Sequence, residues 1–190
     1  MTNMDMLQGL LNRVSMPLLV EPAPTEAQLE NLWQAALRAP DHGNLKPYRF
    51  LVIAGDKRTE LGELLAQRLL ELKPETDDSL LAKTRNMPAR APMLIALVAC
   101  PQEHPKVPLA EQVQSAACAG QNILHAAFAQ GLGAVWRTGW VAEDKQIQAT
   151  LGLSESEQML GYIYIGTPKT ALREVPVIDA TPFVSQWTGA

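Results

Sequence analysis

The chain has 190 residues, of which 47% are hydrophobic and 19% are charged, and its formal net charge at pH 7 is −4. This length favours one domain, residues 1–190, with a core large enough to fold without a metal ion or a disulfide. The apolar content excludes an intrinsically disordered chain. The acidic balance excludes a nucleic-acid-binding protein that depends on a basic surface.

No apolar stretch approaches the roughly 20 residues of a membrane-spanning helix, and the N-terminus lacks the features of a signal peptide. Cys100 and Cys118 form no CxxC pair, and the histidines are not spaced like metal ligands. We therefore expect a cytoplasmic protein with two buried thiols and no metal centre, whose partners include neither a nucleic acid nor a membrane.

Hydrophobic periodicity and capping signals predict five helices. Thr25, with Gln28 three residues later, has the spacing of a capping box, and the helix it begins should end before Pro40. The fourth helix is rich in Ala, Gly and Cys, so its neighbours can approach closely. The predicted helices cover residues 4–12, the segment after Thr25, Asp56 to Leu72, about Leu109 to Gln130, and 143–151.

Apolar runs predict four strands, at residues 49–54, 93–99, 133–138 and 159–166, and the segment from Pro74 to Asn86 is expected to be a polar loop. Strands that alternate with helices indicate a three-layer α/β or α+β domain, and this pattern alone favours a parallel sheet. Residues 167–190 contain three prolines and should be extended. They are too apolar for a free tail, so they need a surface to lie on, such as another subunit.

Motifs for several common activities are absent from the sequence. It has no P-loop, no dinucleotide-binding fingerprint and no nucleophile elbow, so a hydrolase that uses Asp41, His42 and a serine is a weak alternative. His104 should lie in an exposed loop. His125 should lie on a helix face, hydrogen-bonded rather than acting as a ligand.

Three short segments combine residues that suit a phosphate and a planar ring. Residues 12–15 (NRVS) place an arginine and a hydroxyl at the end of a helix before an extended stretch, a pair that suits a phosphate. Residues 38–48 (RAPDHGNLKPY) form a polar loop before a strand, and residues 136–138 (WRT) end a buried strand. Each segment taken singly also has a structural explanation: solvated surface or a cap at Arg13 and Ser15, turn residues at Asp41 and His42, and a core position for Trp136.

In this order, the segments resemble the nitroreductase family of FMN-dependent oxidoreductases, in particular its small, single-domain bacterial branch. The family's early helix ends in an RRS-like element, its flavin loop has the pattern AP(S/D)xxNxQPW, and the small branch carries QGxGxxWR(S/T)G. The matching segments here are residues 13–15, 39–48 and 130–139. The GTP at 166–168 also fits, and the resemblance covers about residues 5–184.

The resemblance implies an α+β fold with a three-layer, mixed and largely antiparallel sheet flanked by helices, in place of the parallel sheet. It also implies a homodimer with FMN at the subunit interface. The C-terminal tail, residues 167–190, would be extended and would cross to the partner subunit.

The resemblance also assigns residues to the cofactor sites. Arg13, Val14 and Ser15 would hold the phosphate and ribityl end of FMN. Further contacts with the flavin, some of them from the second subunit, would come from Arg38, Pro40, His42, Asn44, Trp136, Arg137 and Thr138. The end of the central helix would bind NADH or NADPH through Ala126, Ala127, Phe128, Ala129, Gln130 and Gly131.

Three positions depart from the family pattern. Val14 replaces an arginine, which removes a phosphate charge and predicts weaker FMN affinity. Lys46 replaces a glutamine, and Tyr48 replaces a tryptophan. Lys46 either restores the lost positive charge or stabilises negative charge on the reduced flavin.

The sequence therefore predicts an enzyme in which flavin takes a hydride from NAD(P)H and passes electrons to a small acceptor, such as a nitroaromatic or a quinone, by a ping-pong mechanism. No catalytic side chain is expected, because the chemistry belongs to the flavin. Two alternatives remain: a flavin-binding storage or sensing protein without turnover, and a different flavin chemistry, such as dehalogenation or dehydrogenation, on the same fold.

Overall fold

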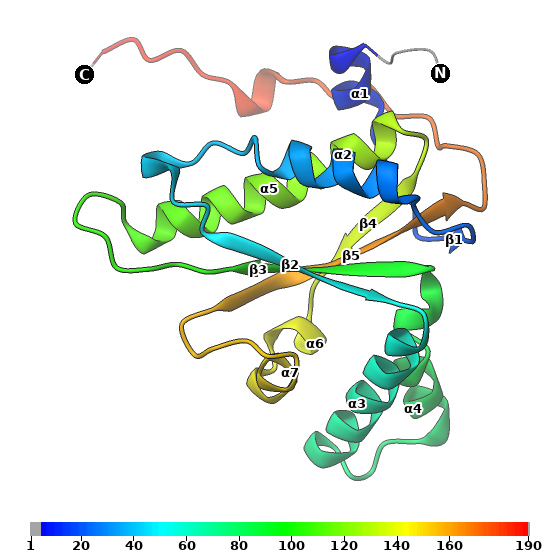
Figure 1. Ribbon diagram of the computed structural model, residues 1–190. Coiled ribbons are helices and arrows are strands. Elements are labelled where there is room, and N and C mark those ends of the chain that lie inside the picture. The colour runs from blue at the N-terminus through cyan, green and yellow to red at the C-terminus, as the bar shows by residue number, and fades with distance from the viewer. Residues whose placement is uncertain (1–4, 190) are drawn as a thin grey trace.

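The computed structural model describes residues 5–189 and has helices on both faces of one sheet (Figure 1). Met4, at which the first helix was expected to begin, lies outside the described residues. The helices are α1 (Met6–Asn12), α2 (Glu26–Ala36), α3 (Asp56–Leu72), α4 (Asp78–Arg85), α5 (Leu109–Ala129), α6 (Trp140–Glu143) and α7 (Lys145–Thr150). The strands are β1 (Leu19–Val20), β2 (Tyr48–Ala54), β3 (Met93–Ala99), β4 (Gly133–Arg137) and β5 (Gln158–Pro168). Three short 3-10 helices are η1 (His42–Asn44), η2 (Pro88–Arg90) and η3 (Thr181–Phe183).

The sheet has the order β1-β5-β3-β2, and β4 also pairs with β5. All four recorded strand pairings are antiparallel, so the parallel sheet favoured by the alternating pattern is wrong. The alternating pattern gives the order of helices and strands along the chain. It does not say whether a connection leads into the next strand in the parallel or the antiparallel direction. The largely antiparallel α+β fold expected from the family is confirmed.

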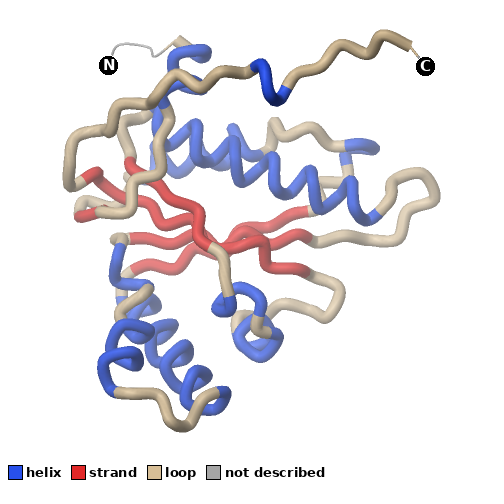
Figure 2. Tube along the Cα trace, turned by 180° about the vertical axis from the view of Figure 1, so that it is seen from behind, coloured by secondary structure: helices blue, strands red, loops and turns tan. Residues whose placement is uncertain are grey.

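Helices lie on both faces of the sheet (Figure 2), and the core has two halves, one on each face. One half packs α2 and α5 against the sheet, and the other packs α3, α6 and α7 against the opposite face. β3 is buried along its whole length, as its continuous apolar run predicts. At Gly120 a Cβ atom would collide with Leu97, so the small residues of α5 allow the helix to lie close to the sheet.

The local structure agrees with the sequence prediction at the start of α2 and differs from it at α4 and at the two cysteines. The capping box is confirmed, because the Gln28 amide donates to Thr25 Oγ1 at 3.3 Å and the Thr25 amide donates to Gln28 Oε1 at 2.9 Å. The prediction of a polar loop from Pro74 to Asn86 is wrong, because this segment contains α4. Asp77 caps α4 by accepting from the Leu80 amide. The prediction of two buried thiols is also wrong: Cys100 is half-buried, and Cys118 is exposed on α5.

Beyond β5 the chain runs on as an extended segment interrupted by η3 (Figure 2), and it is exposed through residue 189. Its apolar side chains face solvent: Phe183 is 80% exposed and Trp187 is 89% exposed. Among residues 5–189, no helix is both long enough and apolar enough to span a bilayer.

Candidate functional site

The segment Arg13-Val14-Ser15 lies beside the outer edge of β4. Asp5 caps α1 by accepting from the Leu7 amide at 2.9 Å, and the chain becomes extended after Asn12. The Met16 amide then donates to the carbonyl of Ala134 in β4 at 2.9 Å. Val14 packs against the half of the core that lies between the sheet and α3, α6 and α7. An apolar residue therefore suits this position. Ser15 is exposed, and Arg13 is half-buried.

The end of β4 separates the predicted residues onto two faces of the sheet. Trp136 packs against Gly120 of α5, and its indole Nε1 donates to the Leu160 carbonyl at 3.0 Å. The indole is therefore partly buried against the core on the α5 side of the sheet. Arg137 points to the other face, where its guanidinium lies 5.5 Å from the centre of the Tyr164 ring. Thr138 is exposed just after the strand.

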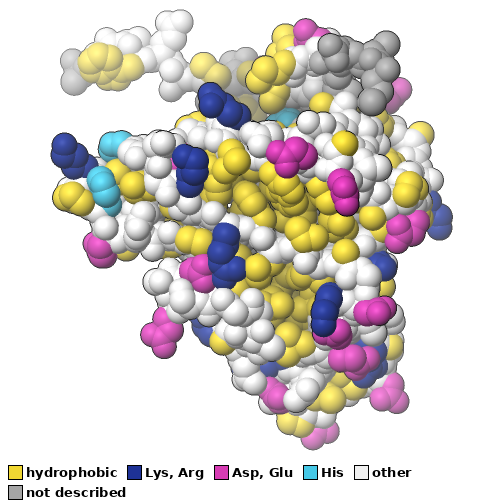
Figure 3. Space-filling view, viewed as in Figure 1, with side chains coloured by type: hydrophobic (Ala, Val, Ile, Leu, Met, Phe, Trp, Pro, Cys, Tyr) yellow, Lys and Arg dark blue, Asp and Glu magenta, His cyan; other side chains and the backbone are white. Residues whose placement is uncertain are grey.

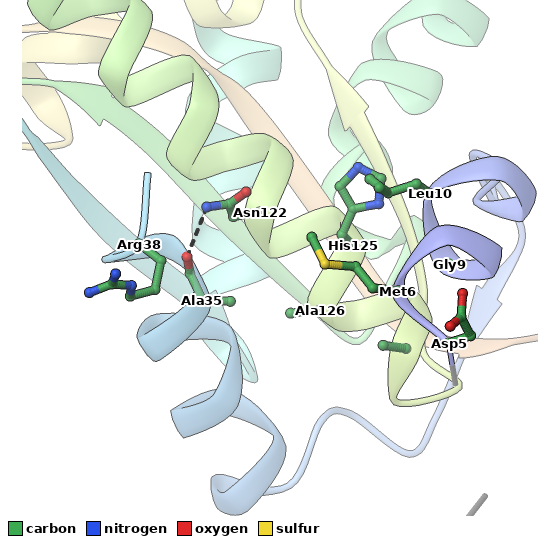
Figure 4. Close-up of a pocket in the computed structure, with 10 residues that line it drawn as sticks. Asp5, Met6, Gly9, Leu10, Ala35, Arg38, Asn122, His125 and Ala126 are labelled. Atoms are coloured by element: carbon green, nitrogen blue, oxygen red, sulfur yellow. Dashed lines mark hydrogen bonds between the residues drawn. The ribbon is translucent and has the colours of Figure 1, made fainter. Parts of the chain in front are cut away.

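A cavity of about 430 Å3 lies between α1, α2 and α5 (Figure 4). It brings Arg38 together with Ala126 and Ala129, which the sequence assigned to two different ligands. His125 also lines it, with Nε2 2.6 Å from the Gln121 amide nitrogen and with Nδ1 buried and unpaired among the described residues. Burial, and then the nearby charge of Arg13, lower the pKa of His125 and so favour its neutral ring.

The remaining residues of the expected nicotinamide segment have limited access to a ligand. The side chains of Ala127 and Phe128 are buried in the core. The Gln130 amide oxygen accepts from Asn31 Nδ2 at 2.8 Å, so this side chain ties the end of α5 to α2. Exposed positions in the segment are Ala129 and Gly131.

The loop that carries Pro40, His42 and Asn44 is held in an unusual backbone conformation. Asn44 and Lys46 have φ values of 55° and 49°, which are uncommon for residues with a side chain. Asp41 Oδ2 accepts from the Lys46 amide at 2.6 Å, and Lys46 Nζ donates to Asn44 Oδ1 at 2.6 Å. Strain of this kind is often found at functional sites.

His42 is paired with a residue that sequence reasoning missed. Its Nδ1 lies 2.8 Å from Glu111 Oε2, in the first turn of α5. Since an α-helix rises about 1.5 Å per residue, Glu111 and His125 lie roughly 21 Å apart along α5. Within one chain, the His42 loop and the Arg13 segment are therefore near opposite ends of this helix. No sequence motif marks Glu111.

No group of three or more His, Cys, Asp or Glu side chains that could hold a metal ion occurs within residues 5–189. Cys100 is not a candidate nucleophile, because burial and then the neighbouring Glu157 carboxylate raise the pKa of its thiol to about 12.

Comparisons with known proteins agree with this architecture. The model of the nitroreductase family matches residues 17–167. The chain is 42% identical over 183 residues to "Putative NAD(P)H nitroreductase YdjA" of Escherichia coli K12, covering 96% of this chain and 99% of that protein. A nitroreductase-like family protein from Bacillus cereus has a similar structure, with a TM-score of 0.83, 20% identity, and coverage of 100% of this chain and 99% of that chain.

A further solved structure, a "putative nitroreductase in complex with fmn" from Desulfovibrio desulfuricans, has a TM-score of 0.74 and 22% identity. It covers 99% of this chain and 100% of that one. At this identity the likeness concerns the fold. From the family match and the full-length relative, we conclude that the chain belongs to the nitroreductase family. It is therefore an oxidoreductase enzyme.

The residues beside β4 fit a phosphorylated flavin by the chemistry of their donors. Arg13 and Ser15 offer a cation and a hydroxyl on one extended segment. Arg137 has a buried Nε–H that finds no acceptor among the described residues. A buried donor left unpaired is costly, so this position suits a ligand that carries an acceptor.

Proposed function

We propose that the chain is an FMN-dependent oxidoreductase that uses NADH or NADPH to reduce a small acceptor, such as a nitroaromatic or a quinone. The observation that carries this proposal is the hydrogen bond from the Met16 amide to the Ala134 carbonyl. It holds the Arg13–Ser15 segment against β4, the strand that carries the QGxGxxWR(S/T)G motif. Two segments far apart in the sequence thus form one edge with donors for an anion.

The chain's own residues would bind and orient the cofactor. Arg13 and Ser15 would hold its phosphate and ribityl end, and exposed Thr138 would contact the ring from the end of β4. Trp136, partly buried against α5 and hydrogen-bonded to the Leu160 carbonyl, would support the backbone of that strand rather than stack on the flavin. When bound, FMN supplies the hydride and electron chemistry.

The acceptor and the nicotinamide would use the same face in turn, which predicts ping-pong kinetics. Double-reciprocal plots at several acceptor concentrations should then give parallel lines. Crossing lines would indicate a ternary complex and contradict the shared face.

The visible absorption spectrum of the purified protein, recorded anaerobically before and after NADH or NADPH is added, tests the proposal. A flavin spectrum that bleaches supports the enzyme and identifies the donor. A flavin spectrum that stays unchanged favours a storage or sensing protein, or a flavin chemistry with another donor. A colourless protein that fails to take up added FMN would contradict flavin binding altogether.

A homodimer with FMN at the interface completes the proposal. The His42 loop and the Arg13 segment lie near opposite ends of α5, so a second copy could bring one loop to the other chain's segment. Apolar surface also calls for a partner: hydrophobic side chains gather in the middle of the face in Figure 3. On the edge strand β2, Val52 is 48% exposed beside a groove formed with α3 and α7.

A further inference from the structure

The first turn of α5 is fixed to the loop that precedes it by a buried side chain. Gln112 is only 1% exposed, and its amide oxygen accepts from the Gln102 amide at 2.9 Å. Its Nε2 donates to the carbonyls of Gln102 at 2.8 Å and of Val107 at 3.2 Å. A buried amide with this set of partners is held in one conformation. Glu111, the residue before it, is therefore attached to a fixed backbone.

The loop that carries His42 packs against the same structure. Gly43, the residue after His42, has a φ of 77°, and a Cβ on it would lie 3.3 Å from Val107 Cγ2. Val107 is itself buried, so it supports the loop from below. The backbone on both sides of the contact between His42 and Glu111 is thus in place before any ligand binds.

The contact between Glu111 and His42 determines which ring nitrogen carries the proton. Glu111 Oε2 lies 2.8 Å from His42 Nδ1. An ionised carboxylate can only accept a hydrogen bond, so a neutral ring in this contact carries its proton on Nδ1. Nε2 is then unprotonated, and no group within residues 5–189 bonds to it. The side chain of His42 is 57% exposed, which leaves the ring accessible to a ligand.

This arrangement reverses the usual preference of the histidine ring. In water a neutral histidine carries its proton mostly on Nε2, which makes that nitrogen a donor. With the proton held on Nδ1, Nε2 becomes an acceptor, the group required to bind an N–H of a flavin ring. Carboxylates fix the tautomer of histidine in the same way at metal sites and in catalytic triads.

We propose that Glu111 is a positioning residue for FMN: it holds His42 with the proton on Nδ1, so that Nε2 is presented to the flavin ring as a hydrogen-bond acceptor. This inference rests on the proposed function, in which a second copy brings the His42 loop to the flavin. Glu111 belongs to no motif of the sequence and lies 69 residues beyond His42. It acts on the cofactor only through His42.

The nitrogen-15 NMR shifts of the His42 ring test the tautomer in the flavin-free full-length chain. At a pH about two units above the ordinary histidine pKa, we expect the proton on Nδ1 in the natural protein and mainly on Nε2 in Glu111→Ala. Glu111→Gln keeps an acceptor oxygen and should keep much of the natural tautomer. A natural protein whose His42 carries its proton on Nε2 would overturn the proposal.

Fluorescence titration of the flavin-free chain with FMN tests the effect on the cofactor. Glu111→Ala should weaken FMN binding by about three- to tenfold, as expected for one neutral hydrogen bond. Glu111→Gln should lose less than about twofold. Glu26→Ala is the matched control, because it also removes an acidic residue from the first turn of a helix, where the helix dipole favours it. Glu26 takes part in none of the ion pairs formed within residues 5–189, so its loss should leave the affinity unchanged.

A double-mutant cycle shows whether Glu111 acts through the ring. When His42→Ala is already present, the addition of Glu111→Ala should cause no further loss of FMN affinity. An equal loss with and without the His42 ring would overturn the proposal, because Glu111 would then act through α5 itself.

The FMN titrations also separate this inference from the proposed function. If the natural protein takes up FMN and Glu111→Ala binds it within about twofold as tightly, the positioning role is overturned and the proposed function stands. If the natural protein takes up no FMN at all, the proposed function fails and this inference fails with it.

Discussion

Arg13 is the residue on which the proposed cofactor affinity depends most, because its neighbour Val14 is committed to the core. A charge-assisted contact to a phosphate contributes about 1.5–3 kcal/mol, so Arg13→Gln should weaken FMN binding by about tenfold or more. Fluorescence titration of the flavin-free chain measures this loss. Lys83→Gln, an exposed cation on α4, should leave the affinity unchanged. Equal affinities for both variants would remove Arg13 from the site.

Glu157 makes the stability of the fold depend on pH. It accepts from Arg49 Nε at 2.5 Å and from the Ser154 amide at 2.8 Å. The Arg49 hydrogen bond is the main reason that the pKa of Glu157 falls from 4.5 to about 2. A lowered folded-state pKa stabilises the fold above the unfolded-state value, and this stability is lost as the pH falls from about 4.5 towards 2.

Glu157→Gln should therefore lower the free energy of unfolding at pH 7 by about 1–2 kcal/mol, a range that allows for partial solvent screening. The difference from the natural protein should shrink as the pH approaches 2. Urea unfolding at several pH values measures both effects. Glu155→Gln, an exposed neighbour in the same loop, is the control. A constant difference across this pH range would show that the pair does not act through ionisation.

At the residue scale, the sequence shows which residues belong to a motif, but it does not show towards which face of the sheet each side chain points. The resemblance places Trp136, Arg137 and Thr138 in one motif, yet the strand sends the first two to opposite faces. Glu111, the partner of His42, could not be found from motifs, because only the packing of the His42 loop against the first turn of α5 brings the two side chains together.

At the scale of elements, Gly161 fixes how β5 supports the end of β4. Its φ of 137° is rare for a residue with a side chain, and a Cβ there would lie 2.5 Å from the Arg137 carbonyl oxygen and from Trp136 Nε1. Gly161→Ala should cost about 2–4 kcal/mol of stability through strain and overpacking, and it should also weaken FMN binding.

Gly152→Ala measures the cost of a side chain at a positive φ alone, without the close contacts that a Cβ would make at Gly161. Gly152 has a φ of 79°, but a Cβ at this position meets no atom within 4 Å. Thermal unfolding and flavin titration of both variants should show a cost of about 1 kcal/mol at Gly152, with unchanged flavin affinity. If both variants lose the same stability and neither loses flavin, the contact with β4 has no role in the site.

The same scale shows why some elements were predictable. The strand at 93–99 and the helix that begins at Leu109 have strong hydrophobic patterns, and both occur with the expected bounds to within a residue. α4 was missed because its exposed face is polar, and tertiary packing against α3 stabilises it: a Cβ on Gly62 of α3 would collide with the Arg85 carbonyl. β1 has two residues, too few for a periodic signal.

At the scale of the whole molecule, the exposed tail predicts the state of assembly. Phe183 and Trp187 are nearly as exposed as in an unfolded chain, so a single copy gains almost no free energy from them. If the tail crosses to a partner, Phe183→Ala with Trp187→Ala should weaken the dimer without unfolding the subunit. Light scattering on the natural protein should give the mass of two chains. The double variant should dissociate at protein concentrations at which the natural protein is still a dimer.

The control is Ser185→Ala with Thr188→Ala, which changes polar positions of the same tail and should leave the dimer intact. Since the proposed flavin site draws on both subunits, dilution that dissociates the variant should also release its flavin; flavin that stays bound to a monomer would place the whole cofactor site within one chain.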